Sequence, residues 1–203
     1  MLYLSLLTRH SLLFFGGVLM RIIAGRDRGR RLKSIDRGDV RPTTDRTKES
    51  LFNIIGPNIG GVRFLDLFAG FGGIGIEALS RGAAEVVFVE RDRRNAKIIN
   101  ENLAIVGYED DSQVISNDVL KALEGLTGDF DLIFMDPPYE ELELYNQTLD
   151  KIKEYKLLHP TGIIIIEHFS KDTIALPEGY DIIKEKKYGK SGITLLKIRE
   201  GEE

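Results

Sequence analysis

From residue 62 onward, short apolar segments alternate with segments of helical periodicity, and this alternation limits the possible folds more than any other feature. Strands that alternate with helices are joined by right-handed crossovers and lie parallel in one sheet. Two further apolar segments end the chain on either side of a Gly-containing turn at 189–192, which predicts an antiparallel hairpin at one edge. The sequence therefore predicts an α/β, Rossmann-like fold with a seven-stranded, mostly parallel sheet over residues 62–203. The expected strands are 62–68, 85–90, 112–117, 130–136, 162–169, 181–189 and 193–198, and the expected helices are 74–82, 93–107, 118–126 and 141–155.

A smaller unit, residues 20–61, precedes this domain. Residues 21–40 contain closely spaced Gly and Arg and predict a small irregular hairpin. The next segment, 41–55, predicts a loop followed by a helix that Thr44 or Asp45 can cap with a side-chain oxygen. We expect this unit to form an N-terminal arm and helix beside the main domain.

The first nineteen residues are apolar but are interrupted by Arg9 and His10. Neither apolar piece is long enough to span a bilayer, and no small-residue cleavage motif follows them. Met20 opens a segment that reads as a natural start. We interpret residues 1–19 as an extension produced by a start codon chosen too far upstream, and the alternative is a short anchor at a membrane surface.

Cysteine is absent from the 203 residues, which excludes disulfides, thiolate zinc sites and a cysteine nucleophile. Such a composition fits a reducing compartment, so we predict a cytoplasmic protein without a membrane partner, and a monomer. His159 and His168 lie nine residues apart and have no Cys to join them, so no metal site is predicted.

The charge is unevenly distributed along the chain. Residues 20–63 contain 11 Lys and Arg against 5 Asp and Glu, whereas residues 64–203 contain 16 against 27. Nine of the basic residues lie between Arg26 and Lys48, interleaved with Gly rather than spaced as helical pairs. This pattern favours a basic arm that binds a polyanion over the alternative of a solvated surface segment.

A glycine motif, Gly70-x-Gly72-x-x-Gly75, lies between the first strand and the first helix of the main domain. Glycines there allow a tight turn and the close approach of a ligand to the backbone. Glu90 ends the next strand 20 residues after Gly70, where its carboxylate can accept both hydroxyls of a ribose. If the glycines only closed a turn, Glu90 would have no explanation.

Two ligands compete for this loop, a dinucleotide and S-adenosylmethionine. A pyrophosphate prefers bare backbone amides, and a nearby carboxylate repels it. Asp66 precedes Gly70 by four residues, where it suits the cationic amino group of a methionine moiety. Asp118 follows the third strand and is placed to accept from an adenine amino group, or to cap a helix, and the two roles are compatible. The acidic residues favour S-adenosylmethionine.

Asp136-Pro137-Pro138-Tyr139 follows the fourth strand and forms a stiff corner with a carboxylate at its tip. In a doubly wound sheet this corner faces the same crevice as the glycine loop. The Asp136 carboxylate and the Pro137 carbonyl can hold the two N–H bonds of an exocyclic nucleobase amine, and Tyr139 can stack on the base. A plain strand-to-helix turn is the alternative, and it is disfavoured by the glycine motif at the matching strand.

The chain resembles the bacterial 16S ribosomal RNA guanine-N2 methyltransferase family from Met20 to about Ile198. The resemblance lies in "MRIIAGRDRGRRL" (20–32), "RPTTDRTKESLFNII" (41–55), "DLFAGFGGIGIEALSRGA" (66–83) and "DPPY" (136–139). Phe71 stands where this family is expected to have a small hydroxyl residue. The resemblance implies methyl transfer from S-adenosylmethionine to the N2 amine of one guanine of 16S ribosomal RNA, either free or in an assembling 30S subunit.

Carried over by position, the resemblance and the patterns above predict three sets of site residues. The catalytic set is Asp136, Pro137, Pro138 and Tyr139. The cofactor-binding set is Arg41, Pro42, Thr43, Asp66, Phe68, Gly70, Gly72, Glu90, Arg91, Asn117, Asp118 and Asp136. The RNA-binding set, in the basic arm, is Arg26, Arg28, Arg30, Arg31 and Lys33.

Three other functions compete with this interpretation. An adenine-N6 methyltransferase acting on DNA or RNA is the nearest, because the same corner can hold either amine. A nicotinamide-dependent dehydrogenase is disfavoured by the acidic residues, and a non-catalytic RNA-binding module is disfavoured by the intact corner and glycines. Outside the three sets, we expect Glu167 to be structural, with a position facing the substrate as the alternative, and Tyr188 and Lys190 could touch RNA.

Overall fold

A seven-stranded sheet with the order β5-β4-β3-β6-β7-β9-β8 forms the centre of the protein. The structure is a computed structural model, and it describes residues 20–35, 44–56, 59–138, 141–171, 176–199 and 201. Strands β3 to β7 are parallel, whereas β9 is antiparallel to both of its neighbours, β7 and β8. The predicted fold class is therefore confirmed, including the C-terminal hairpin at one edge. The strand bounds are β3 (Arg63–Leu67), β4 (Glu85–Val89), β5 (Ser112–Ile115), β6 (Phe130–Met135), β7 (Leu158–Phe169), β8 (Tyr180–Tyr188) and β9 (Ser191–Ile198).

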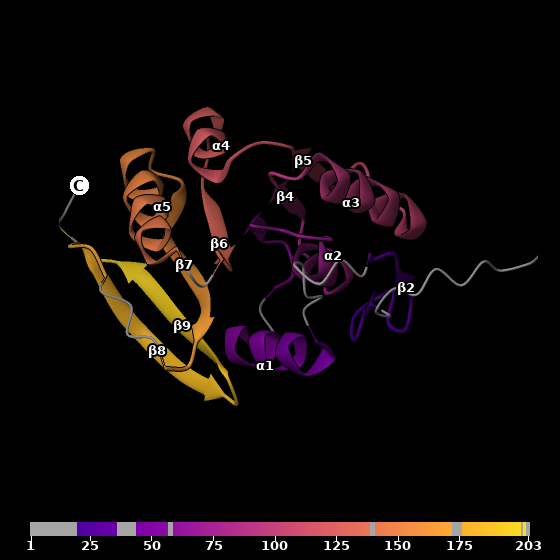
Figure 1. Cartoon of the computed structure of the whole chain (residues 1–203), viewed down its shortest axis with the longest axis horizontal. Coiled ribbons are helices and arrows are strands. Elements are labelled where there is room, and N and C mark those ends of the chain that lie inside the picture. Colours follow the sequence, from indigo (N-terminus) through magenta and orange to yellow (C-terminus); the bar gives the residue numbers. More distant parts are fainter. Residues whose placement is uncertain are drawn as a thin grey trace, which may run out of the picture.

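Helices cover both faces of the sheet (Figure 1). Successive strand residues point to opposite faces, so Phe64 packs in the core beneath α1, α2 and α3, while Leu65 packs in the core beneath α4 and α5. No helix in the described ranges is long and apolar enough to cross a membrane. The helix bounds are α1 (Asp45–Ile55), α2 (Gly73–Ser80), α3 (Arg93–Val106), α4 (Val119–Gly125) and α5 (Leu142–Glu154).

Local sequence accounts for where the helices begin and end. The Thr44 hydroxyl accepts from the Thr47 amide at 3.2 Å and caps α1, and Asp118 caps α4 through the amides of its first turn. Gly107 ends α3 with φ 74°, a left-handed conformation that favours glycine. Strand β7 is longer than the sequence predicted, because it begins at Leu158, before an irregularity in its pairing with β6.

The N-terminal arm forms the expected hairpin, with β1 (Met20–Arg21) antiparallel to β2 (Arg31–Leu32). It is anchored on the buried carboxylate of Glu77 in α2, which accepts from the amides of Ile23 and Ala24 at 2.9 Å each. The Lys48 ammonium from α1, also fully buried, lies 3.4 Å from the same carboxylate. A buried charge is stable only when it is paired and hydrogen-bonded, so this network ties the arm and α1 to the helix that follows the glycine loop.

Candidate active site

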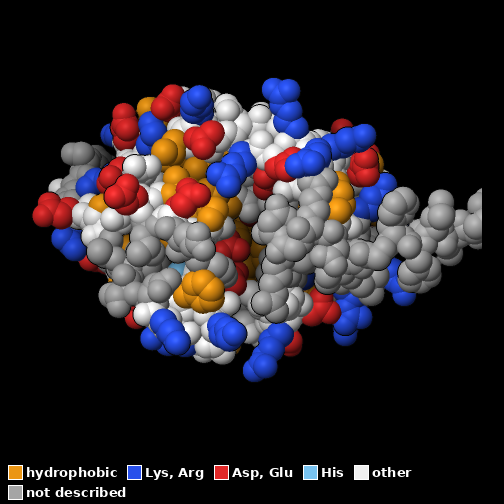
Figure 2. Space-filling model, in the orientation of Figure 1, with side chains coloured by type: hydrophobic (Ala, Val, Ile, Leu, Met, Phe, Trp, Pro, Cys, Tyr) orange, Lys and Arg blue, Asp and Glu red, His pale blue; other side chains and the backbone are white. Residues whose placement is uncertain are grey.

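A cavity of about 850 Å³ opens at the carboxyl ends of the parallel strands. Its walls come from the loops after β3, β4, β5 and β6 and from the end of β7, together with the first turns of α1 and the β8–β9 turn. Figure 2 shows acidic side chains inside the hollow of this face and Lys and Arg side chains along its lower edge. Of the predicted site residues, the cavity brings together Asp66, Phe68, Gly70, Glu90, Arg91, Asn117, Asp118, Asp136, Pro137 and Pro138.

The glycines of the loop have different tasks. Gly70 lines the cavity with φ 56°, and its neighbour Phe68 also has a positive φ of 63°, a strained conformation for a residue with a side chain. Gly72 does not line the cavity: it caps α2 at φ 80° and faces the side chain of Ile99. Gly75 lets α2 approach the sheet, because a Cβ there would lie 2.2 Å from the ring of Phe88. The cofactor contact predicted for Gly72 stays a prediction.

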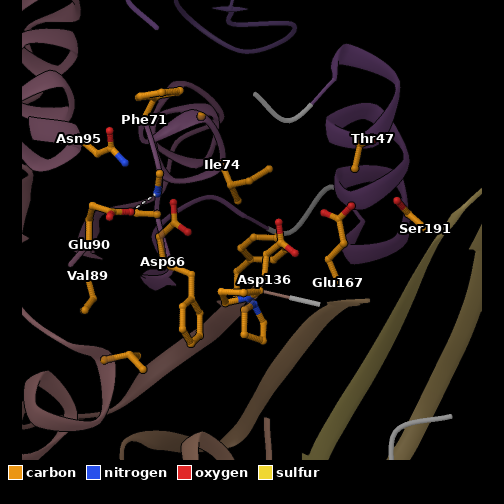
Figure 3. A pocket seen from close by; sticks show the side chains of 18 of the residues that line it. Thr47, Asp66, Phe71, Ile74, Val89, Glu90, Asn95, Asp136, Glu167 and Ser191 are labelled. Atoms are coloured by element: carbon orange, nitrogen blue, oxygen red, sulfur yellow. Dashed lines mark hydrogen bonds between the residues drawn. The ribbon is translucent and has the colours of Figure 1, made fainter. Parts of the chain in front are cut away.

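Glu90 is nearly buried and held at both oxygens. Its Oε2 accepts from the Gly70 amide at 2.7 Å (Figure 3). Its Oε1 accepts from the Asp92 amide at 2.8 Å. Burial raises the pKa of Glu90, and these two amides together with the Asn95 side chain oppose the rise. The Oδ1 of Asn95 is buried at the cavity wall without a hydrogen-bond partner among the described residues. An acceptor left unpaired beside a carboxylate suits a ligand with adjacent hydroxyls, such as a ribose.

Asp66 lies on β3 with only 1% of its surface exposed. Its Oδ2 accepts from the Gly75 amide at 2.8 Å. Burial raises the pKa of Asp66 to about 7, against the effect of the Gly75 bond, and the charge of Glu90 adds to the rise. A buried carboxyl group with this pKa can hold a cation at the cavity wall, because a positive charge would stabilise its ionised form.

Asp118 and its neighbours form the exposed rim near α4. Both capping bonds of Asp118, to the amides of Leu120 and Lys121, use Oδ1. The capping role that the sequence left open is therefore present, and it leaves the Oδ2 position compatible with the predicted contact to an adenine amine. Arg91 and Asn117 are exposed at the same rim.

Asp136 follows β6 directly, and Pro137 and Pro138 line the cavity beside it. Tyr139 lies outside the described residues. Burial, then the charges of Glu167 and Asp66, raise the pKa of Asp136 well above its ordinary value. Within the described ranges, no group of three or more His, Asp or Glu side chains is arranged to hold a metal ion.

The position of Glu167 favours the second of the two roles that the sequence left open for it, a place that faces the substrate. It lines the cavity next to Asp136 (Figure 3). The sequence signal was its position at the end of β7, but nothing in the sequence shows that β7 lies beside β6. That neighbourhood is a property of the sheet order.

The first turns of α1 form a side of the cavity whose residues the sequence did not predict as site residues. Thr44, Arg46, Thr47 and Ser50, from the first turns of α1, line it. The predicted cofactor residues Arg41, Pro42 and Thr43 precede this helix and lie outside the described residues. Helical spacing puts Thr47 and Ser50 on the same face of α1, which the sequence could have shown. That this face borders the cavity follows only from the packing of α1.

The predicted RNA-binding residues of the arm are all exposed, and none of them lines the cavity. Arg26 stacks over the ring of Tyr108 at 4.6 Å, and the Arg30 guanidinium donates to the Ile105 carbonyl at 2.8 Å. These basic residues therefore lie along the ends of α2 and α3, whereas Met20, at the start of the arm, lines the cavity. Lys190 and Tyr188 do line the cavity mouth.

Comparison with known proteins gives the family. A family model described as "Conserved hypothetical protein 95" matches residues 20–197. Proteins named ribosomal RNA small subunit methyltransferase D are similar along most of the chain: the Haemophilus influenzae one is 37% identical over 174 residues (84% of this chain, 89% of that protein), and the Escherichia coli one is 32% identical over 181 residues (89% and 90%). The chain belongs to the ribosomal RNA small subunit methyltransferase D family.

Solved structures agree with membership of this family. The Escherichia coli protein yhhF has a TM-score of 0.81 at 30% identity and covers 90% of this chain and 99% of its own. The Haemophilus influenzae protein HI0767 has a TM-score of 0.75 at 34% identity and covers 90% of this chain and 100% of its own. The similarity thus includes the arm and the cavity as well as the sheet, and the class I methyltransferase fold is shared.

Proposed function

We propose that this protein transfers a methyl group from S-adenosylmethionine to the exocyclic N2 amine of a guanine in the 16S ribosomal RNA of the small ribosomal subunit. Family membership supports methylation of ribosomal RNA, since the relatives carry that activity in their names. The observation that carries the proposal is the corner after β6, where Asp136 and Pro137 line the same cavity as the glycine loop and Glu90.

The cavity residues fit S-adenosylmethionine. Glu90 and the unpaired Oδ1 of Asn95 lie together where they can receive the ribose hydroxyls. Buried Asp66 can pair with the amino group of the methionine moiety, and Asp118 can accept from the adenine amine. Arg41, Pro42 and Thr43 would complete the cofactor site from the segment before α1. When bound, this cofactor supplies an electrophilic methyl group on a sulfonium.

Asp136 and the Pro137 carbonyl would hold the two N–H bonds of the amine and aim its lone pair. The amine is a weak nucleophile because its lone pair is delocalised into the ring, so orientation is the main requirement. Positioning and preorganised acceptors can contribute roughly 7–11 kcal/mol in favourable cases. Tyr139 would stack on the target base, a contact worth ~1–3 kcal/mol in nucleic-acid binders. Pro137 and Pro138 stiffen the backbone that carries these groups.

RNA would reach the cavity over basic surfaces. Most affinity for RNA comes from phosphate contacts, and the target base must leave its stack to reach the cavity. The proposed phosphate-binding surface of the arm contains Arg26, Lys33 and three further exposed residues, Arg28, Arg30 and Arg31, which we call the arm arginines. Lys190 and Arg46 extend this role to the cavity mouth.

Methyl transfer from labelled S-adenosylmethionine to under-methylated small-subunit RNA or particles tests the proposal, followed by nucleoside analysis. We expect the label in N2-methylguanosine. Label in N6-methyladenosine would instead identify an adenine-N6 methyltransferase. Asp136→Ala should abolish turnover and still bind the cofactor through the other residues of the cofactor-binding set. Asp110→Ala, at an exposed site after α3, should leave both turnover and cofactor binding unchanged. Full turnover by Asp136→Ala would refute the proposed catalytic role.

A further inference from the structure

We infer that Glu167 determines the base specificity of the site by accepting the N1–H of the target guanine. The inference deepens the proposed function and rests on it. Glu167 would act beside Asp136 and the Pro137 carbonyl, so that three acceptors meet the three neighbouring N–H bonds of a guanine edge.

The sheet places Glu167 next to the catalytic corner. Met135 of β6 pairs with Ile166 of β7 in parallel register, so Asp136 and Glu167 are the next residues on two neighbouring strands. Since strand side chains alternate, both follow the alternation that puts Phe134 and Ile165 on the α1 side of the sheet. Figure 3 shows the two carboxyl groups directed into the same part of the cavity.

Glu167 is held in place from two sides. Ser191, the first residue of β9, lies beside its carboxyl group (Figure 3) and opposes the rise of the Glu167 pKa that burial causes. Its backbone carbonyl accepts from the buried Tyr145 hydroxyl at 3.3 Å. Only 5% of the Glu167 surface is exposed. The carboxyl group is therefore positioned firmly enough to distinguish one hydrogen-bonding pattern from another.

Two carboxyl groups side by side in a buried place repel each other when both are ionised, and burial raises the pKa of both. A ligand that brings several N–H donors between them would relieve this repulsion. No salt bridge to Glu167 is found among the described residues, and its neighbour Ser191 also lines the cavity.

The chemistry of the two purines then decides the specificity. Guanine presents N1–H and the two N–H bonds of its N2 amine as adjacent donors. Adenine presents two N–H bonds on N6 followed by N1, which is an acceptor. An ionised Glu167 would place a lone pair against the lone pair of adenine N1, and sites that hydrogen-bond a substrate group discriminate against its absence by roughly 10⁴–10⁵-fold at best.

The substitution Glu167→Gln tests this inference because an amide can donate to an unprotonated N1. Once the labelled guanine has been mapped, small-subunit RNA is rebuilt by ligation with 2-aminopurine at that position. This base keeps the amine at C2 but has an acceptor at N1. We measure kcat/KM for both RNAs with wild type, Glu167→Gln and Glu154→Gln, an exposed control at the far end of α5.

We expect wild type and the control to prefer guanine over 2-aminopurine by at least about 100-fold, and Glu167→Gln to lower that preference at least about tenfold. Comparing the preference between enzymes cancels the different intrinsic reactivities of the two amines. An unchanged preference, with both rates lowered equally, would overturn the inference and leave the proposed function standing.

Cofactor binding serves as the check on folding. If Glu167→Gln fails to bind S-adenosylmethionine, Ser191→Ala replaces it, since this change removes the polar side chain beside Glu167 and keeps the carboxyl group. A lowered preference in Ser191→Ala supports the inference, and an unchanged one overturns it. If the wild-type enzyme transfers no label into N2-methylguanosine, the proposed function itself is refuted.

Discussion

Asp66→Asn should make the ligand-free protein more stable while weakening cofactor binding. Asp66 is buried, and the pKa of its carboxyl group is raised from 3.8 to about 7. Because the folded-state pKa lies above the unfolded one, the folded protein holds an extra proton between these values, and stability falls as pH rises through this window. Asparagine removes the charge and keeps an oxygen that can accept from the Gly75 amide, now 2.8 Å from Asp66 Oδ2.

The magnitude follows from the two pKa values. At 1.36 kcal/mol per pKa unit, the ionised carboxylate costs up to about 4 kcal/mol at pH 8, above both values. Between the two values, at pH 5, the cost is about 2 kcal/mol, because only the unfolded carboxyl group is ionised there. Asp66→Asn should therefore exceed wild type in the free energy of unfolding by up to these amounts, with the larger gain at the higher pH.

Urea unfolding at pH 5 and pH 8, followed by circular dichroism, measures the increase in the free energy of unfolding. Asp110→Asn is an exposed control, for which this free energy should change little. Calorimetry should show S-adenosylmethionine binding about 10- to 100-fold more weakly, since a hydrogen bond to a charged group is lost. The reasoning about Asp66 would be refuted if Asp66→Asn were less stable than wild type at pH 8. It would also be refuted if the stability difference between variant and wild type were not smaller at pH 5 than at pH 8.

Three other predictions test the packing, the arm and the corner. Gly75→Ala puts a Cβ 2.2 Å from the Phe88 ring and should lower the free energy of unfolding by about 1–3 kcal/mol, whereas Gly125→Ala, with open space around it, should not. Equal stability of the two variants in urea would contradict the close packing of α2. Reversing the three arm arginines to Glu should weaken RNA binding in a filter assay and spare cofactor affinity, and unchanged RNA retention would exclude the arm as a phosphate-binding surface. The pKa of Asp136 is raised by burial and by Glu167, so kcat/KM should increase as pH rises through that raised pKa and level off once the carboxylate is ionised; a profile that is already flat from the ordinary carboxyl range upward would show that Asp136 is not limiting.

Much of the site could be predicted because its residues follow strand ends. Asp66, Glu90, Asp118 and Asp136 each stand at or just after the carboxyl end of an apolar segment, and parallel strands bring those ends to one edge. The roles that the sequence left open, that of Glu167 among them, depend on which elements become neighbours in the sheet.

The sequence by itself determined the alternation of strands and helices, the glycine turn and the caps, since these depend on periodicity and on conformational preferences of single residues. Only the tertiary structure decided the order of the strands, and with it that β7 lies beside β6, that Glu167 faces Asp136 and that α1 closes the cavity. It also decided the protonation of these acids: Asp66 resembles any other aspartate in the sequence, and its pKa rises because folding removes its water and leaves one amide in exchange. Local chemistry is encoded locally, whereas burial and charge proximity exist only once distant segments have packed.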